Sequence, residues 1–84
     1  MNSYNLGDDE IKNIDRIKKV GLKIAYYRNL RELSQEELAS MVFLSREQIN
    51  RIESPNGKSF TSVDTLFCIA DALEIDIRRL FDFE

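Results

Sequence analysis

Apolar residues recur along this chain in steps of three and four, which is the spacing of amphipathic α-helices. In the first third of the chain the pattern fits either one long helix or two that meet near Gly21. We favour a main helix over residues 18–31, preceded by a helical segment. We therefore treat residues 1–17 as an N-terminal extension, partly mobile or helical, and residues 18–84 as the folded domain.

Two serine caps predict a pair of short helices, joined by a tight turn, over residues 34–53. Ser34 is followed three residues later by Glu37, and Ser45 in the same way by Gln48. At this spacing the serine bonds a first-turn N–H, while the other side chain reaches back to the cap. The apolar positions form one inward-facing seam across both helices: Leu38, Ala39, Val42, Leu44, Ile49 and Ile52.

The outer face of the second capped helix carries Arg46, Glu47, Asn50 and Arg51. A helix that buries one side and exposes arginine and asparagine in its first turns can read base edges in a major groove. The same face on an arbitrary amphipathic helix is more often merely solvated. Whether this face contacts DNA or is merely solvated therefore has to be judged from the rest of the sequence.

The rest of the chain also predicts helices. Residues 54–62, SPNGKSFTS, form a loop that holds the only proline, Pro55. A fourth helix, capped by Thr61 or Ser62, extends to about Leu73, and a fifth short helix covers residues 77–81. The pattern therefore predicts an all-α fold, a compact five-helix bundle.

The net charge of −3 is unusual for a nucleic-acid-binding protein, but the charge is unevenly distributed. Residues 1–11 carry −3 and residues 61–84 carry −4. Residues 12–60 hold ten lysines and arginines against six acids, a net charge of +4. Because the local field steers a polyanion, the basic middle of the chain is compatible with DNA binding. Its small excess of cations makes affinity dependent on dimerisation and on salt.

Composition argues against an enzyme, a metal site and a cofactor site. The chain has no histidine, and it shows no glycine-rich phosphate loop, nucleophile elbow or metal-ligand motif. Cys68 is the only cysteine, and in its amphipathic segment we predict a small, partly buried core residue. No apolar run approaches the roughly 18 residues of a membrane span. The acidic N-terminus lacks the features of a signal peptide, so we expect a cytoplasmic location.

The order and spacing of these residues resemble the Cro and phage-repressor (Xre-type) helix-turn-helix family of DNA-binding transcriptional regulators. The likeness covers about residues 20–81, and its signals are weak singly and strong together. It implies a lambda-repressor-like DNA-binding domain with the helix-turn-helix at about residues 34–53. The residues that carry it are Arg28, Leu33, Ser34-Gln35-Glu36-Glu37-Leu38-Ala39, Ser45, Ile49, Ile52-Glu53, Thr65-Leu66, Ile69-Ala70 and Ala72-Leu73.

The resemblance implies which residues contact DNA. Ser45, Arg46 and Glu47 occupy the first recognition positions, and Asn50 and Arg51 lie one turn further along. Arg46 suits guanine and Asn50 suits adenine, and each such contact is worth about 1–3 kcal/mol of discrimination. Glu47 is able to accept from cytosine or to repel wrong bases.

The resemblance also implies supporting roles. Gln35 would contact a phosphate and brace the recognition helix. Lys58 and Ser59 match loop positions that contact the DNA backbone, and Arg28 and Glu53 match a structural ion pair.

Two features depart from the family pattern. Phe43 stands in the turn where glycine is usual, and a positive φ is costly for a bulky residue. We therefore expect either a distorted turn or a special packing of the ring. The loop of residues 54–62 is also about two residues longer than usual, which bears on its phosphate contacts.

The expected function is that of a sequence-specific regulator of transcription that binds double-stranded DNA. We expect a repressor that acts as a homodimer on a palindromic operator, without cofactor, metal, membrane contact or small-molecule effector. The alternatives are an antitoxin-like or controller-type regulator, and a protein-interaction bundle that does not bind DNA.

Overall fold

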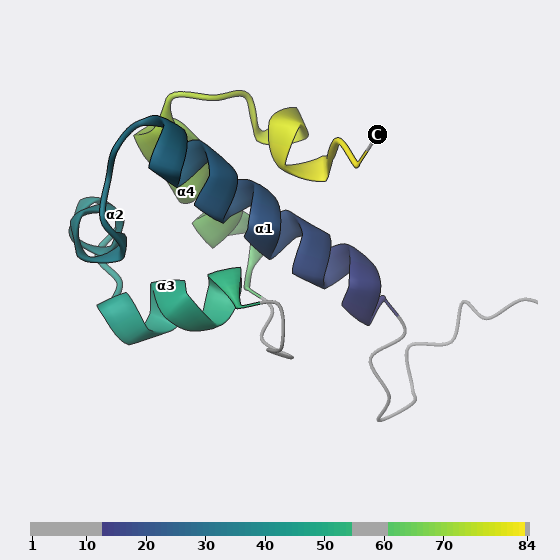
Figure 1. Ribbon diagram of the computed structural model, residues 1–84, viewed down its shortest axis with the longest axis horizontal. Helices are drawn as coiled ribbons and strands as arrows, with labels where there is room; N and C mark the ends of the chain where they lie inside the picture. The colour runs from purple at the N-terminus through teal and green to yellow at the C-terminus, as the bar shows by residue number, and fades with distance from the viewer. Residues whose placement is uncertain (1–12, 55–60, 84) are drawn as a thin grey trace, which may run out of the picture.

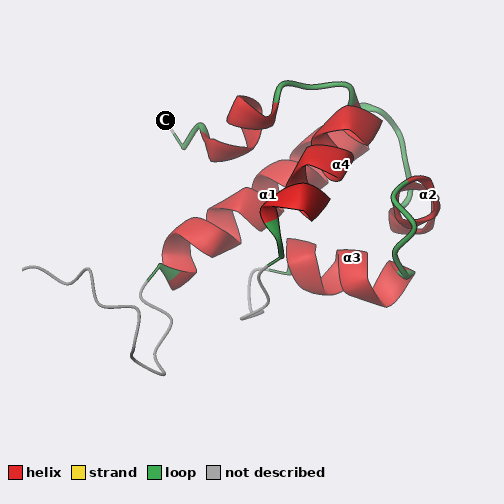
Figure 2. Ribbon diagram, turned by 180° about the vertical axis from the view of Figure 1, so that it is seen from behind, coloured by secondary structure: helices red, strands yellow, loops and turns green. Residues whose placement is uncertain are grey.

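The computed structural model describes residues 13–54 and 61–83, which form four α-helices and one short 3₁₀ helix. The long helix α1 runs through the centre of the molecule, with α4 packed behind it (Figure 1). The reverse view places α4 in front of α1 and shows helices and loops only (Figure 2). The elements are α1 (Ile14–Leu30), α2 (Gln35–Met41), α3 (Arg46–Glu53), α4 (Val63–Leu73) and η1 (Ile77–Phe81).

Helix α1 is continuous from Ile14 to Leu30 and has no break at Gly21. The glycine serves a different purpose, since a Cβ atom at this position would lie 2.1 Å from the backbone oxygen of Ile52. Only a residue without a side chain allows α1 to lie this close to the end of α3. Gly21 therefore fixes how closely α3 approaches the central helix.

The two serine caps form as predicted. The Ser34 hydroxyl accepts from the Glu37 N–H at 3.0 Å, and the Glu37 carboxylate accepts from the Ser34 N–H at 2.8 Å. The bond from the Ser34 backbone lowers the pKa of Glu37. Ser45 and Gln48 make the same reciprocal pair at 3.1 and 2.8 Å. The starts of α2 and α3 are therefore both defined by local sequence.

Three helices end in the same way, each on a non-glycine residue in the left-handed region. Glu32, Phe43 and Glu74 have φ values of 58°, 58° and 57°. In each case the N–H of the following residue bonds a carbonyl five positions back, which is the Schellman motif. The three bonds are Leu33 to Arg28 at 3.1 Å, Leu44 to Ala39 at 2.9 Å and Ile75 to Ala70 at 3.0 Å.

The turn between α2 and α3 is therefore regular, and the ring of Phe43 is 95% exposed. Neither expectation for Phe43 is correct, because the turn is undistorted and the ring does not pack. The residue that does pack is Leu44, whose side chain contacts the core.

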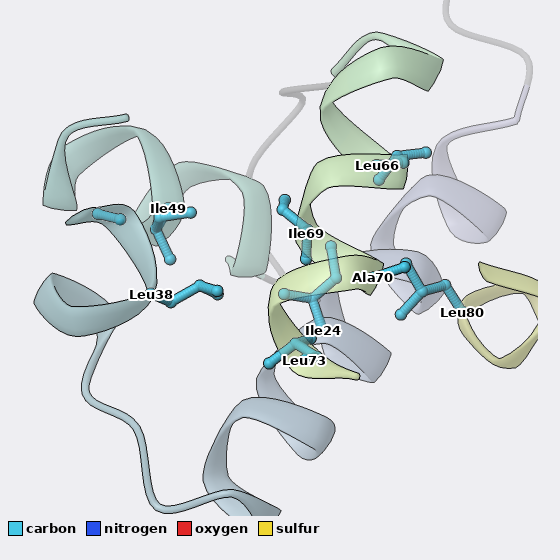
Figure 3. Packing of buried hydrophobic residues seen from close by; sticks show 9 residues of the cluster. Ile24, Leu38, Ile49, Leu66, Ile69, Ala70, Leu73 and Leu80 are labelled. Carbon is cyan, nitrogen blue, oxygen red and sulfur yellow. The ribbon is translucent and has the colours of Figure 1, made fainter. Parts of the chain in front are cut away.

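The core lies where the four α-helices and η1 meet (Figure 3). Each element contributes at least one side chain that is fully or nearly fully buried. Because a chain this short buries a limited area, stability depends on these few contacts. The core consists of Ile24, Leu38, Ala39, Ile49, Leu66, Ile69, Ala70, Leu73 and Leu80.

The predicted count of five helices is corrected to four α-helices. The fifth element, η1, is a 3₁₀ helix, and its hydrogen bonds span three residues, as from the Arg79 N–H to the Asp76 carbonyl at 2.9 Å. Asp76 caps it by accepting from the Arg78 N–H at 2.9 Å. The Arg78 side-chain hydrogen bond lowers the pKa of Asp76 to about 2. Leu80 provides its buried contact.

Cys68 is exposed, so its predicted place in the core is wrong. Phe67 beside it is also half-exposed, whereas Leu66, Ile69, Ala70 and Leu73 face inward. The buried stripe of α4 is therefore narrower than its run of apolar residues indicates.

Replacing Phe43 by glycine is expected to stabilise the protein by about 1 kcal/mol, because the left-handed conformation costs a residue with a Cβ roughly that much. The ring is solvent-exposed, so little packing is lost. Thermal unfolding should show a melting temperature about 4–8 °C higher for a domain of this size. The matched control is Phe43→Ala, which removes the ring and keeps the Cβ atom. Equal stability of the two variants would contradict the argument.

Candidate nucleic-acid interface

Helix α3 divides cleanly into a buried side and an exposed side. Ile49 is completely buried, and Glu53 is 6% exposed. The side chains that face solvent are Arg46, Glu47, Gln48, Asn50 and Arg51. The serine cap leaves the hydroxyl proton of Ser45 available as a donor, since the oxygen accepts the Gln48 N–H. All five predicted contact residues from Ser45 to Arg51 are thus exposed on one short helix and its cap.

The buried end of α3 is held by an ion pair between Glu53 and Arg28 of α1. Arg28 Nε lies 2.7 Å from Glu53 Oε2, and Arg28 Nη2 lies 3.0 Å from Oε1. The two side chains are 11% and 5% exposed. Such a bidentate pair fixes direction as well as distance. Arg28 Nη1 also donates to the backbone oxygen of Leu33 at 2.7 Å, so the same guanidinium binds the segment between α1 and α2.

Gln35 connects α2 to this pair. Its Nε2 donates to Glu53 Oε1 at 3.0 Å and to Asn50 Oδ1 at 3.3 Å. Gln35 therefore braces α3 from the first residue of α2. Both Nε2 protons have partners, so the remaining hydrogen-bond donor of Gln35 is its backbone N–H in the first turn of α2. This network also links one predicted base-contacting residue, Asn50, to the buried ion pair.

The sequence profile of the helix-turn-helix family matches residues 24–80 of the chain, and this range includes Arg28, Gln35 and the whole of α3. The chain belongs to the helix-turn-helix family. It is 39% identical over 62 residues to an uncharacterized HTH-type transcriptional regulator of Methanocaldococcus jannaschii, covering 74% of this chain and 91% of that protein. This helix-turn-helix protein is therefore a DNA-binding transcriptional regulator.

Solved structures agree on the fold. The restriction-modification controller protein C.AhdI of Aeromonas hydrophila is 31% identical, with a TM-score of 0.71, and the match covers 77% of this chain and 96% of that chain. SinR, the master regulator for biofilm formation, was solved in complex with DNA. It is 25% identical with a TM-score of 0.68, and the match covers 75% of this chain and 98% of that chain.

Two of the predicted contact residues of this helix-turn-helix protein belong to the loop between α3 and α4. Lys58 and Ser59, with the rest of residues 55–60, lie outside the described part of the chain. Within residues 13–54 and 61–83, no helix combines the length and apolar character needed to cross a membrane. The same residues contain no group of three or more histidine, cysteine or acidic side chains placed to hold a metal ion.

Sequence reasoning missed two members of the network. The Leu33 carbonyl accepts from Arg28, and the Asn50 side chain accepts from Gln35. No local pattern indicates either contact, because the first involves backbone and the second joins residues fifteen positions apart.

Arg28→Ala is expected to cost about 3–5 kcal/mol in the free energy of unfolding, because it leaves the Glu53 carboxylate buried without its cation. The matched control is Arg31→Ala at the end of the same helix. Arg31 pairs with Glu74 at 2.7 Å as well, but these side chains are 39% and 70% exposed. We expect a loss below about 1 kcal/mol for that pair. Urea unfolding measures the free energy of unfolding of both variants. Equal losses would contradict the argument that burial makes the Arg28–Glu53 pair more important for stability.

Proposed function

We propose that this chain is a sequence-specific regulator that binds double-stranded DNA as a homodimer and represses transcription from a palindromic operator. The observation that carries the proposal is the division of α3, which buries Ile49 and Glu53 and exposes Arg46, Asn50 and Arg51 together. A helix held by one side and polar on the other is able to enter a major groove.

The proposed contacts follow from the chemistry of each exposed side chain. Arg46 donates to guanine O6 and N7, and Asn50 pairs with adenine. Glu47 accepts from cytosine N4, while Ser45 and Arg51 contact bases or neighbouring phosphates. The backbone N–H of Gln35, at the positive end of α2, faces a phosphate. Lys58 and Ser59 are proposed to contact the DNA backbone, from sequence position alone.

Similarity to the controller protein C.AhdI favours a second candidate, a controller-type regulator. The two candidates share DNA binding and differ in the direction of regulation. A reporter gene placed behind the selected operator distinguishes them, because a repressor lowers expression and a controller that activates raises it.

The first experiment selects duplexes from a random pool with the full chain and measures affinity by fluorescence anisotropy. Arg46→Ala should weaken binding to the selected duplex about tenfold, because a bidentate contact to guanine is lost. The control is Arg79→Ala, which removes the same charge from η1, on the other side of α1 from α3 (Figure 1). It should bind within about twofold of the wild type, and the affinity of the wild type and of Arg79→Ala should fall with salt by the same slope. Failure to retain any duplex, or equal losses in the two variants, would defeat the proposal.

Dimerisation is proposed to use the C-terminal aromatic residues. Phe81 and Phe83 are 49% and 36% exposed, and neither belongs to the exposed side of α3, which must stay free to meet DNA. Exposed aromatic side chains are typical anchors of protein interfaces. A dimer on a palindrome then places two copies of α3 about one helical turn apart, roughly 34–36 Å.

Sedimentation equilibrium should give twice the 9.8 kDa chain mass for the wild type. The double variant Phe81→Ser, Phe83→Ser should raise the dimer dissociation constant at least about tenfold, since hot-spot residues each cost about 2 kcal/mol or more. Leu30→Ser, which removes an exposed apolar side chain from the end of α1, is the control and should remain dimeric. A monomeric wild type, or a dimer that the double variant leaves intact, excludes this interface. Thermal unfolding confirms that each variant is folded.

A further inference from the structure

We infer that Gln35 controls which base Asn50 selects, by holding the Asn50 amide in one of its two orientations; this inference rests on the proposed function. An asparagine side chain ends in a carbonyl oxygen that accepts and an amino group that donates. Its two orientations therefore present opposite hydrogen-bonding groups to DNA, and they match different base edges.

The orientation of the Asn50 amide is determined step by step, starting from the buried carboxylate of Glu53. The Glu53 carboxylate is paired with Arg28 and is able only to accept. The amide atom of Gln35 at 3.0 Å from Glu53 Oε1 must then be the nitrogen, because an oxygen there would face another oxygen with no proton between them. The buried ion pair thus fixes the amide of Gln35.

The same logic continues to Asn50. The second proton of Gln35 Nε2 faces Asn50 Oδ1 at 3.3 Å, so the asparagine turns its oxygen toward α2. Its amino group consequently faces away from Gln35, on an exposed side chain. We call the linked side chains of Glu53, Gln35 and Asn50 the amide relay. Because of the relay, Asn50 offers two N–H donors outward and keeps one oxygen lone pair unused.

This arrangement specifies the base. An outward donor matches the N7 acceptor of a purine, and the remaining lone pair accepts the N6 amino proton of adenine. Cytosine, which presents an amino donor in the major groove, opposes the outward N–H groups. Gln35 itself contacts no base in this scheme and acts as a positioning residue, through the orientation of Asn50.

The test measures base preference, which a purely structural or phosphate-contacting Gln35 would not change. Every position of the selected operator is substituted, and affinities are compared for the wild type, Asn50→Ala, Gln35→Met and the double variant. Asn50→Ala identifies the position that Asn50 reads, as the one where preference for adenine falls about tenfold. Gln35→Met keeps the side-chain volume and should lose most of that preference at the same position only. The double variant should lose no more than Asn50→Ala alone.

Gln48→Met is the matched control, since it removes another amide that bonds the Ser45 cap and lies outside the amide relay. It should leave the preference at the Asn50 position intact. A uniform loss of affinity in Gln35→Met, with preference at that position preserved, would overturn the inference. So would an Asn50→Ala variant whose preferences match those of the wild type.

A measurement on the free protein separates this inference from the proposed function. In NMR spectra, the side-chain amide protons of Gln35 should exchange with solvent more slowly than those of Asn50. Asn50→Ala should shift one Gln35 amide proton more than the other. Equal exchange and no selective shift would overturn the amide relay even if DNA binds. Wild-type protein that binds no duplex would instead refute the proposed function, while the spectra still decide the orientation.

Discussion

The geometry of the site depends on the ion pair and hydrogen bonds that the Glu53 carboxylate accepts. Glu53 ends α3, and its carboxylate accepts from Arg28 of α1 and from Gln35 of α2, so that three helices meet at one buried group. A carboxylate that is 5% exposed must have its acceptor sites filled, because an unpaired buried charge is strongly unfavourable. The positions of α1 and α2 are thereby coupled to the direction of α3. Gly21 supports the same arrangement, since it allows the α1 backbone to contact Ile52.

The helix ends show how this small protein balances strain against burial. Glu32, Phe43 and Glu74 adopt a left-handed conformation that costs about 1–2 kcal/mol each. Each is followed by an apolar residue that contacts the core and whose N–H closes the Schellman bond. These side chains are partly buried, so each gains a share of the roughly 1.5–3 kcal/mol that full burial gives, and this share offsets the strain. A glycine would remove the strain, but the fold does not require it.

The sequence correctly predicted features that depend on residues close together in the chain. The predictions that were wrong concern how the helices pack against one another. The caps at Ser34 and Ser45 depend on residues three positions apart and are correct. Cys68 was misplaced because α4 is apolar nearly all round, and periodicity alone does not tell which side packs. The short segment after Asp76 formed a 3₁₀ helix, which has the same apolar pattern as a short α-helix. The pairing of Arg28 with Glu53 came from the family likeness, whereas the contact of Gln35 with Asn50 requires the crossing of two helices.

The amide relay matters for DNA binding because the chain carries few positive charges on α3. Only Arg46 and Arg51 are basic on the recognition helix, and the chain as a whole carries −3. Contacts to phosphates are the main source of nonspecific affinity, so a face with few cations gains little from them. Ordering a flexible side chain on binding costs about 0.5–1.5 kcal/mol, and a side chain already held in place avoids part of that cost. In the proposed complex, an acidic regulator that orders Asn50 in advance therefore relies more on base recognition, and less on general attraction, than a strongly basic one.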